Sequence, residues 1–418
     1  MIVFFKVRNF ESIKDTLTLS FLSTSISEHN DSNVVLKGRD ELLRSLVLYG
    51  HNASGKSNIL DAVAFYRWFI VNSATELQSN DEIEADPFRL NSETEKAPSF
   101  FEMCFYIGNV KYRYGFESTK ERVTKEWLLE TKKIKEYPVF LRINDDFQID
   151  EKRIPGALGV EKRTRKNALF ISACSQWNVK KAQKIFKWFD DTYTVHGLMD
   201  NSYRDITLEL LENKKYSRLI NRFLRKADLG INGVNIIDIK LEDIIDFVPE
   251  ELKDDYKEKF KDGNNRAVLM SHDKFDKNNK KIDQAHFLLE KHESEGTKKF
   301  FNLIGVYVKA IIENRFLIID EFDARLHTLL TKAILKLFNS SKVKSESQLL
   351  VAAHDTALLD KRILRRDQIC FVEKNKYGST EMISLVEYKP RKESPFDRNY
   401  LDGKYGGIPI IEDLEELF

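Results

Sequence analysis

Four residues near the start of the sequence have the types and the spacing that bind phosphate groups. Gly50, Gly55, Lys56 and Ser57 match the pattern G-x-x-x-x-G-K-[ST] without departure. Glycines let the backbone curl around a phosphate, so that N–H groups of the loop and of the following helix point at the anion. We expect Lys56 to contact the outer phosphates of a nucleotide and the Ser57 hydroxyl to ligate Mg²⁺. The other predicted loop contacts are Asn52, Ala53, Ser54 and Asn58.

A second group of polar residues follows two apolar runs late in the sequence. The run 316–319 ends in the carboxylates Asp320 and Glu321. We expect Asp320 to hold Mg²⁺, directly or through water, and Glu321 to polarise the water that attacks the γ-phosphate. His354 follows the apolar run 348–353 and could contact the γ-phosphate or orient Glu321. A lone histidine is more often structural, but ligands bind at the carboxyl ends of strands in such folds.

The sequence also predicts the elements that must position these residues. Residues 45–49 read as a buried strand and residues 56–70 as the helix that follows the loop. A chance Gly-Lys-Ser turn is the alternative, but it would not require this order of strand, loop and helix. Alternation over residues 1–22 predicts an opening hairpin. Three further strands are predicted as a meander at 100–107, 110–118 and 122–131. These elements indicate an α/β fold with a mixed sheet.

The pattern changes to helical spacing between residues 179 and 226. Basic residues, among them Lys181, Lys214, Lys215 and Arg218, lie between the apolar ones. They form either a solvated helix face or a surface for nucleic acid or a partner protein.

We therefore divide the chain at the changes of pattern. The tail is expected to dock on the body through Tyr405 and Ile408. The predicted parts are a first lobe at 1–178, a mainly helical insertion at 179–265, a second lobe at 266–390 and a tail at 391–418.

Composition limits the classes of protein to consider. A chain of 418 residues is long enough for two or three domains. Charged residues make up 32%, yet the net charge is +1, so a nucleic-acid site would have to be a local patch. Cys104, Cys174 and Cys370 have no close spacing, which favours a reducing compartment over a disulfide framework or a zinc site. We find no apolar run of membrane-spanning length and no signal segment, and expect a cytoplasmic protein without a membrane partner.

The series of motifs resembles an ABC-type ATPase head of the group that includes SMC, RecF and OLD proteins. The resemblance implies ATP and Mg²⁺ as cofactors. It identifies Ser294, Gly296 and Thr297, which precede a predicted helix, as the signature motif that contacts nucleotide. They depart from the transporter form Leu-Ser-Gly-Gly-Gln, because only the serine and one glycine align. Asp323 corresponds to the D-loop residue. Gln176 is either the Q-loop residue, which would sense Mg²⁺, or a polar residue at a helix start.

Seven short segments are similar to one branch of that group, the bacterial anti-phage ATPases such as AbiL and RloA proteins and the AriA ATPase of PARIS systems. They are residues 9–12, 87–90, 168–172, 227–231, 293–297, 353–356 and 405–409. The resemblance implies an ATP-hydrolysing subunit of an abortive-infection defence system. Such a subunit would sense a phage protein, and it would hold and release a separately encoded effector of nuclease-like kind.

The sequence argues against a nuclease. OLD proteins carry a nuclease centre after the ATPase head, but Glu373 is not followed by the Asp-x-Asp that such a centre needs, so we expect no nuclease in this chain.

Two other functions stay open at this point. A RecF-like DNA-repair ATPase, with DNA as its partner, is the main alternative. A nucleotide-dependent scaffold without useful turnover is the other.

The resemblance also predicts the working unit. In ABC-type heads the signature motif of a second subunit closes the nucleotide site, which implies a head-to-tail homodimer at least. The alternative is that the segment 294–297 is an ordinary helix cap with a glycine turn.

Overall fold

The computed structural model describes residues 1–238, 253 and 266–409. Two compact units are present. The first contains Met1–Leu198, Ala310–Ala324 and Thr331–Phe418, and the second contains Met199–Lys309 and Arg325–Leu330. Each unit is described by itself below.

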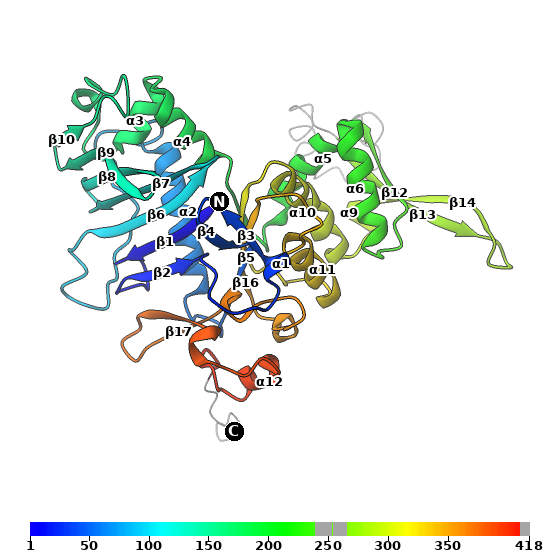
Figure 1. The fold of residues 1–418 in the computed structure, drawn as a ribbon. Coiled ribbons are helices and arrows are strands. Elements are labelled where there is room, and N and C mark those ends of the chain that lie inside the picture. Colours follow the sequence, from blue (N-terminus) through cyan, green and yellow to red (C-terminus); the bar gives the residue numbers. More distant parts are fainter. Residues whose placement is uncertain (239–252, 254–265, 410–418) are drawn as a thin grey trace. The chain divides into compact units, whose positions relative to one another are not determined.

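An antiparallel sheet of seven strands forms one layer of the first unit (Figure 1). The opening hairpin and the meander lie in this one sheet, because the first strand pairs with both the second strand and the meander. Its order is β10 (Asp146–Ile149), β9 (Lys135–Ile143), β8 (Val123–Lys132), β7 (Val110–Ser118), β6 (Ser99–Ile107), β1 (Ile2–Arg8) and β2 (Leu17–Ser20). The predicted hairpin and meander are confirmed.

A second sheet of six strands carries the predicted chemistry. Its order is β11 (Tyr193–His196), β15 (Phe316–Asp320), β16 (Gln348–Ala353), β5 (Ser45–Tyr49), β17 (Ile369–Lys374) and β18 (Thr380–Ser384). All pairs are parallel except that of β17 with β18. The strands β5 and β16 are buried along their whole length, as expected of parallel strands covered on both faces. The predicted α/β class with mixed sheets is confirmed.

One hydrophobic core joins the two sheets to the helices α2 (Lys56–Asn72), α3 (Phe170–Gln176) and α4 (Lys180–Asp190). Tyr66 of α2 stacks on Phe116 at 5.5 Å and donates its hydroxyl to the Tyr114 carbonyl at 2.9 Å. The helix that begins at the phosphate loop is therefore fixed to the antiparallel sheet, and the loop itself is fixed to the parallel one.

The remaining elements of the first unit are short. They are α1 (Asn30–Asn33), β3 (Val34–Lys37), β4 (Asp40–Leu43), α12 (Phe396–Leu401) and turns of 3₁₀ helix at 161–163, 356–358, 366–368 and 385–388. The helix α11 (Thr328–Phe338) begins in the second unit and ends in the first.

The second unit combines helices with a three-stranded antiparallel sheet. The Thr207 hydroxyl bonds to the carbonyls of Phe301 and Asn302 at 3.1 Å, and Gly305 donates its N–H to it at 3.0 Å. This contact brings α5 against α10. The elements are α5 (Arg204–Glu212), α6 (Lys214–Lys226), β12 (Gly233–Asp238), β13 (Arg266–Phe275), β14 (Lys281–Leu288), α9 (Leu289–His292), α10 (Glu295–Ile312) and a 3₁₀ turn at 200–203.

The two compact units do not follow the boundaries predicted from the sequence. The predicted insertion includes residues 179–198, but α4 packs on α2 and β11 pairs with β15, so both belong to the first unit. The predicted second lobe includes β13, β14 and α10, but β13, β14 and most of α10 belong to the second unit. The predicted surface segment 250–265 lies outside the described residues except for Lys253, and so does the tail beyond residue 409.

None of the helices in the described ranges is both long enough and apolar enough to cross a membrane.

Candidate nucleotide-binding site

The phosphate loop has the backbone geometry that its glycines predict. Gly55 has φ +105° and ends the loop directly before α2. A Cβ atom at Gly55 would lie 2.0 Å from Thr380 Oγ1, and one at Gly50 would lie 2.3 Å from the Val372 carbonyl oxygen. Neither position accepts a side chain without movement of its neighbours. Residues 52–58 line a cavity of 310 Å³ together with Glu321 and His354.

Lys56 is held inside this loop. Its residue is 5% exposed, and its Nζ donates to the carbonyls of Gly50 at 2.8 Å and His51 at 3.1 Å. Burial lowers the pKa of Lys56, whereas the carboxylates of Glu321 and Asp320 act in the opposite direction. The loop therefore presents a buried cation that is hydrogen-bonded to backbone carbonyls, a group that phosphate oxygens can engage.

Strand order explains why three residues far apart in the sequence face one cavity. The strand β16 lies between β15 and β5, with Ile319 opposite Val351 and Ala353 opposite Tyr49. The carboxyl ends of the three parallel strands thus meet at one edge, where ligands bind in open α/β sheets. Glu321 and His354 follow two of these strands.

At this edge Glu321 approaches His354. Glu321 Oε1 lies 3.7 Å from His354 Nε2, and the two side chains are about one-third exposed. Glu321 has φ +50°, a left-handed conformation that costs energy for a residue with a side chain. Its N–H donates to Asp320 Oδ1 at 2.9 Å. The predicted catalytic pair and the predicted metal ligand are therefore adjacent.

Asp323 has a clear role within its own chain. Its carboxylate accepts the N–H groups of His354, at 3.0 Å to Oδ2, and of Asp355. These bonds fix the turn that presents the His354 ring. A contact of Asp323 with a second subunit's nucleotide stays a prediction.

Gln176 is not brought to the phosphate loop. It is the exposed last residue of α3, and it does not line the cavity formed by residues 52–58, Glu321 and His354. Ser172 of the same helix donates to the Ile70 carbonyl at 2.5 Å. Because Ile70 lies fourteen positions after Lys56 in α2, about 21 Å of helix separate this contact from the loop. Gln176 ends α3, so the alternative of a polar residue at a helix start does not match its position, and the Q-loop role stays a prediction.

The structure places three further residues beside the site that sequence patterns did not indicate. His196 is in register with Asp320 at the end of β11. Thr380 bonds to Ser12 Oγ at 2.7 Å, although 368 positions separate them. Glu11 is the third, and its Oε2 accepts the side-chain amide of the predicted loop residue Asn58 at 2.6 Å. Glu11 belongs to the segment 9–12, whose only signal in the sequence is its resemblance to the anti-phage ATPases, and neither His196 nor Thr380 belongs to a recognisable motif.

The donor set at the loop fits a Mg²⁺ ion bound together with a nucleotide. The Ser57 hydroxyl and the Asp320 carboxylate are hard oxygen donors. Protein sites for Mg²⁺ commonly supply one or two carboxylates and leave the other positions to phosphate oxygens and water. Within the described ranges, no cluster of three or more His, Cys, Asp or Glu side chains could hold a metal by itself.

In the second unit, the predicted signature segment begins a helix. Ser294 caps α10, because Thr297 donates its N–H to Ser294 Oγ at 3.1 Å. A Cβ at Gly296 would lie 2.7 Å from the Arg325 carbonyl oxygen. Ser294 is exposed. This is the capping geometry of the alternative interpretation, and it also leaves the amino end of the helix accessible to an anion.

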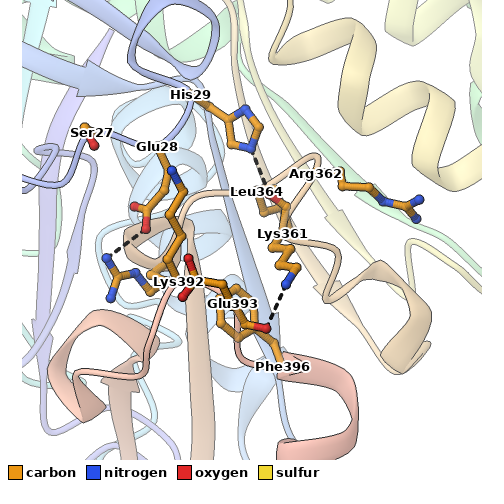
Figure 2. Close-up of a pocket in the computed structure, with 10 residues that line it drawn as sticks. Ser27, Glu28, His29, Lys361, Arg362, Leu364, Lys392, Glu393 and Phe396 are labelled. Carbon is orange, nitrogen blue, oxygen red and sulfur yellow. Dashed lines mark hydrogen bonds and ion pairs between the residues drawn. The ribbon is translucent and has the colours of Figure 1, made fainter.

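A cavity of 560 Å³ lies elsewhere in the first unit and contains none of the predicted site residues (Figure 2). His29 bonds to the Lys361 carbonyl at 2.8 Å, and Lys361 Nζ donates to the Glu393 carbonyl at 2.8 Å. Leu364 and Phe396 form its apolar part. Its lining contains no glycine loop, and we do not assign the nucleotide to it.

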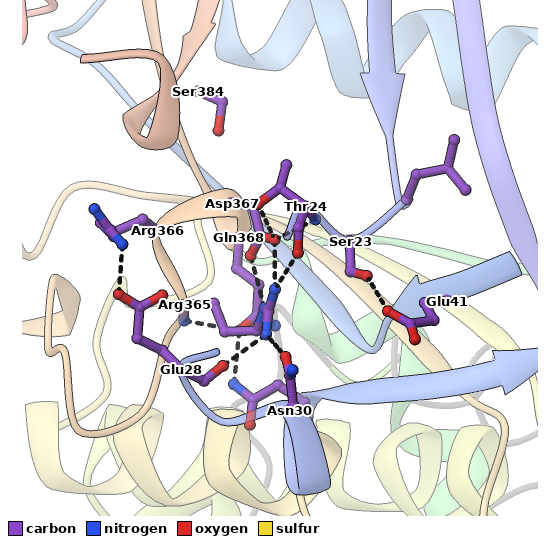
Figure 3. Close-up of polar contacts among 12 residues, drawn as sticks. Ser23, Thr24, Glu28, Asn30, Glu41, Arg365, Arg366, Asp367, Gln368 and Ser384 are labelled. Atoms are coloured by element: carbon purple, nitrogen blue, oxygen red, sulfur yellow. Dashed lines mark hydrogen bonds and ion pairs between the residues drawn. The ribbon is translucent and has the colours of Figure 1, made fainter. Parts of the chain in front are cut away.

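Next to this cavity, Arg365 fastens the chain that follows His354 to the N-terminal segment 24–30 (Figure 3). Its guanidinium bonds to Asp367 at 2.8 and 2.7 Å, and also to the carbonyls of Glu28 and Thr24. Arg365 is fully buried.

The parallel sheet, the glycine loop with its buried lysine and the facing carboxylates define a P-loop protein of the ATPase class. The family described as "AAA domain, putative AbiEii toxin, Type IV TA system" matches residues 45–360, about three quarters of the chain. The chain belongs to this family.

Two solved structures are similar to the chain over most of its length. The SMC head domain from Thermotoga maritima is 15% identical, with 92% of this chain and 98% of that chain covered and a TM-score of 0.42. The SmcHead bound to the C-winged helix domain of ScpA is 16% identical, with 93% of this chain and 99% of that chain covered and a TM-score of 0.45. No curated protein sequence matches the chain significantly.

Proposed function

We propose that the chain binds ATP with Mg²⁺, hydrolyses it, and serves as the ATPase subunit of a bacterial anti-phage, abortive-infection system. The observation that carries the first part is the cavity in which the phosphate loop faces Glu321 and His354. The family description, which names an AbiEii toxin and a type IV toxin–antitoxin system, supports the second part.

Each side chain at the cavity has a distinct task in this proposal. Lys56 exchanges its bonds to loop carbonyls for bonds to the outer phosphates. Ser57 and Asp320 hold Mg²⁺, which neutralises phosphate charge. Glu321 orients and deprotonates the attacking water, and His354 contacts the γ-phosphate from the neighbouring strand.

Calorimetric titration with Mg²⁺ and a slowly hydrolysed ATP analogue tests the binding step. The wild-type chain is expected to bind and Lys56→Ala to lose binding, because the outer phosphates lose their cation. Lys111→Ala is a matched control, since its Nζ pairs with Asp40 in another part of the first unit. Equal affinity of the Lys56→Ala variant and the wild type would contradict the assignment.

We further propose that two chains act together, head to tail. Ser294, Gly296, Thr297 and the positive end of α10 would then close a site on the partner chain. Lys56→Ala and Ser294→Arg are each expected to be inactive alone. Mixed, they should recover part of the hydrolysis, because one of the two sites then has both intact halves. Mixed dimers without any recovery would support the simple capping role of Ser294.

The defence role requires an effector and a phage-derived trigger. The neighbouring genes are expected to encode the effector, and protection of cells from phage should need both proteins and an intact Lys56. Protection by this chain alone would remove the separate effector from the proposal.

DNA binding is the second candidate, and α6 is the observation that favours it. Its residues Lys214, Lys215, Arg218 and Arg222 are exposed, and within the described part of the chain no ion pair joins them to a carboxylate. A RecF-like function predicts tight DNA binding that needs ATP and weakens steeply with salt.

A further inference from the structure

The segment 396–407, which we call the C-terminal clasp, touches the phosphate loop directly. The carbonyl oxygen of Gly407 accepts the N–H of His51 at 2.8 Å. The same oxygen accepts the Tyr400 hydroxyl at 2.8 Å. The N–H of Gly407 donates to Glu373 Oε2 at 2.9 Å. His51 is the first residue after Gly50 in the loop.

His51, which bonds to the clasp, also bonds to Lys56. The carbonyl of His51 accepts Lys56 Nζ at 3.1 Å, next to the 2.8 Å bond from Nζ to Gly50. His51 thus bonds to the clasp through its N–H and to Lys56 through its carbonyl. The Lys56 ammonium group has three N–H donors, and these two carbonyls accept two of them. Phosphate oxygens would therefore engage the same ammonium group that bonds to His51, and His51 is also the residue that anchors the clasp.

Packing around the contact is tight. A Cβ at Gly407 would lie 3.6 Å from Gly50 Cα and 3.3 Å from the Val372 carbonyl oxygen, and Gly407 has φ +66°. This left-handed conformation favours glycine. A side chain at 407 would also require the Val372 carbonyl to move by a few tenths of an ångström.

Aromatic rings hold the clasp on the strand beside the loop. Phe371 of β17 stacks on Tyr400 at 5.0 Å and on Tyr405 at 5.3 Å. Tyr49, the last residue of β5, lies 6.3 Å from both Phe371 and Tyr400. Figure 1 shows α12, which begins the clasp, beside the end of β17. The clasp is thus a packed part of the site and not a loose extension.

We propose that the C-terminal clasp positions the phosphate loop, so that nucleotide binding and docking of the clasp stabilise each other. Tyr400 and Gly407 are positioning residues that act on Lys56 through His51. The coupling is reciprocal, since a contact that favours the nucleotide-bound loop must be favoured by nucleotide to the same extent. This inference rests on the nucleotide binding proposed above and adds a route by which the nucleotide state reaches the C-terminal part of the chain.

The first test removes one hydroxyl. Tyr400→Phe keeps the ring stack but loses the bond to the Gly407 carbonyl, and a hydrogen bond of this kind corresponds to about 2- to 10-fold in affinity. The dissociation constant of Mg²⁺–ATPγS should rise by about that factor. Tyr106→Phe is the control, because its hydroxyl bonds to Asp40 and not to the clasp. Equal dissociation constants for Tyr400→Phe and wild type would overturn the positioning role.

The second test measures the effect of the nucleotide on the clasp. Saturating Mg²⁺–ATPγS should slow tryptic cleavage after Arg398 and Lys404 in the wild-type chain, and should not do so in Lys56→Ala. A wild-type chain that binds the nucleotide but is cut at the same rate would overturn the coupling and leave the proposed ATPase function intact. A wild-type chain that binds no nucleotide would overturn both.

Discussion

Replacing Arg365 by methionine is expected to lower the free energy of unfolding of the first unit by about 3–5 kcal/mol. Arg365 is fully buried and bonds through Nε, Nη1 and Nη2 to Asp367, to the carbonyls of Glu28 and Thr24, and to Asn30. Methionine has a similar length but makes none of these bonds. The two carbonyls and the carboxylate would lose a charged donor in a place that water does not reach.

A double-mutant cycle separates the ion pair from the other losses. The Asp367 side chain is 3% exposed and also accepts two bonds from Thr24, at 2.8 and 2.9 Å. Asp367→Asn can keep an acceptor for Thr24 while it removes the charge. We expect Arg365→Met with Asp367→Asn to be less destabilised than the sum of the single changes, by about 2 kcal/mol, because neither charge is then left buried alone.

Denaturant unfolding followed by tryptophan fluorescence measures this directly. All four tryptophans of the chain, Trp68, Trp127, Trp177 and Trp188, lie in the first unit. Arg362→Met is the control, because that side chain is 80% exposed and should be replaceable without measurable loss. A loss below about 1 kcal/mol in Arg365→Met would refute the view that this arginine fastens the segment after His354.

Two further predictions concern Glu11 and the surface of α6. Burial, and next the charge of Asp61, raise the pKa of Glu11 from 4.5 to about 7, so the folded state binds this proton more tightly and loses stability as the pH rises between these values. Glu11→Gln should flatten that pH dependence and raise the free energy of unfolding near pH 8 by about 1 kcal/mol after solvent screening. If the stability of the variant and of the wild type changed with pH in parallel, Glu11 would not be the source of this pH dependence. Charge reversal of Lys214, Lys215 and Arg218 should weaken association with an anionic partner and leave the basal ATPase rate unchanged; undiminished association would show that these residues are a solvated face.

Local patterns predicted the residues that lie on one continuous segment. The loop 50–57 could be predicted because strand, glycines and helix are adjacent in sequence. Asp320 and His354 could be predicted because each follows an apolar run. Strand order, which brings those runs together, is a property of pairing between distant segments. His196 could not be predicted for that reason: β11 is a four-residue strand that joins the sheet by pairing with β15.

The Q-loop assignment of Gln176, which stays a prediction, and the predicted boundary near 178 rest on the same assumption, that the helical pattern starting at 179 opens a separate insertion. Instead Ile185 and Phe189 of α4 are buried in the core of the first unit. An amphipathic pattern predicts that a helix buries one face but not which element covers that face.

The Gly407 contact was equally invisible in the sequence. The sequence predicts that the tail docks through Tyr405 and Ile408, but tertiary structure alone determines that the Gly407 carbonyl accepts the N–H of His51.

Phosphate release by Glu321→Gln tests the central claim most directly, that the edge of the parallel sheet is a site for ATP hydrolysis. The substitution keeps the size of the side chain and removes the carboxylate that faces His354. The variant is expected to bind Mg²⁺–ATP as tightly as wild type. Its rate of phosphate release is expected to fall by about 10²-fold or more, the range for a lost general base. Undiminished phosphate release by this variant, with binding intact, would contradict the account.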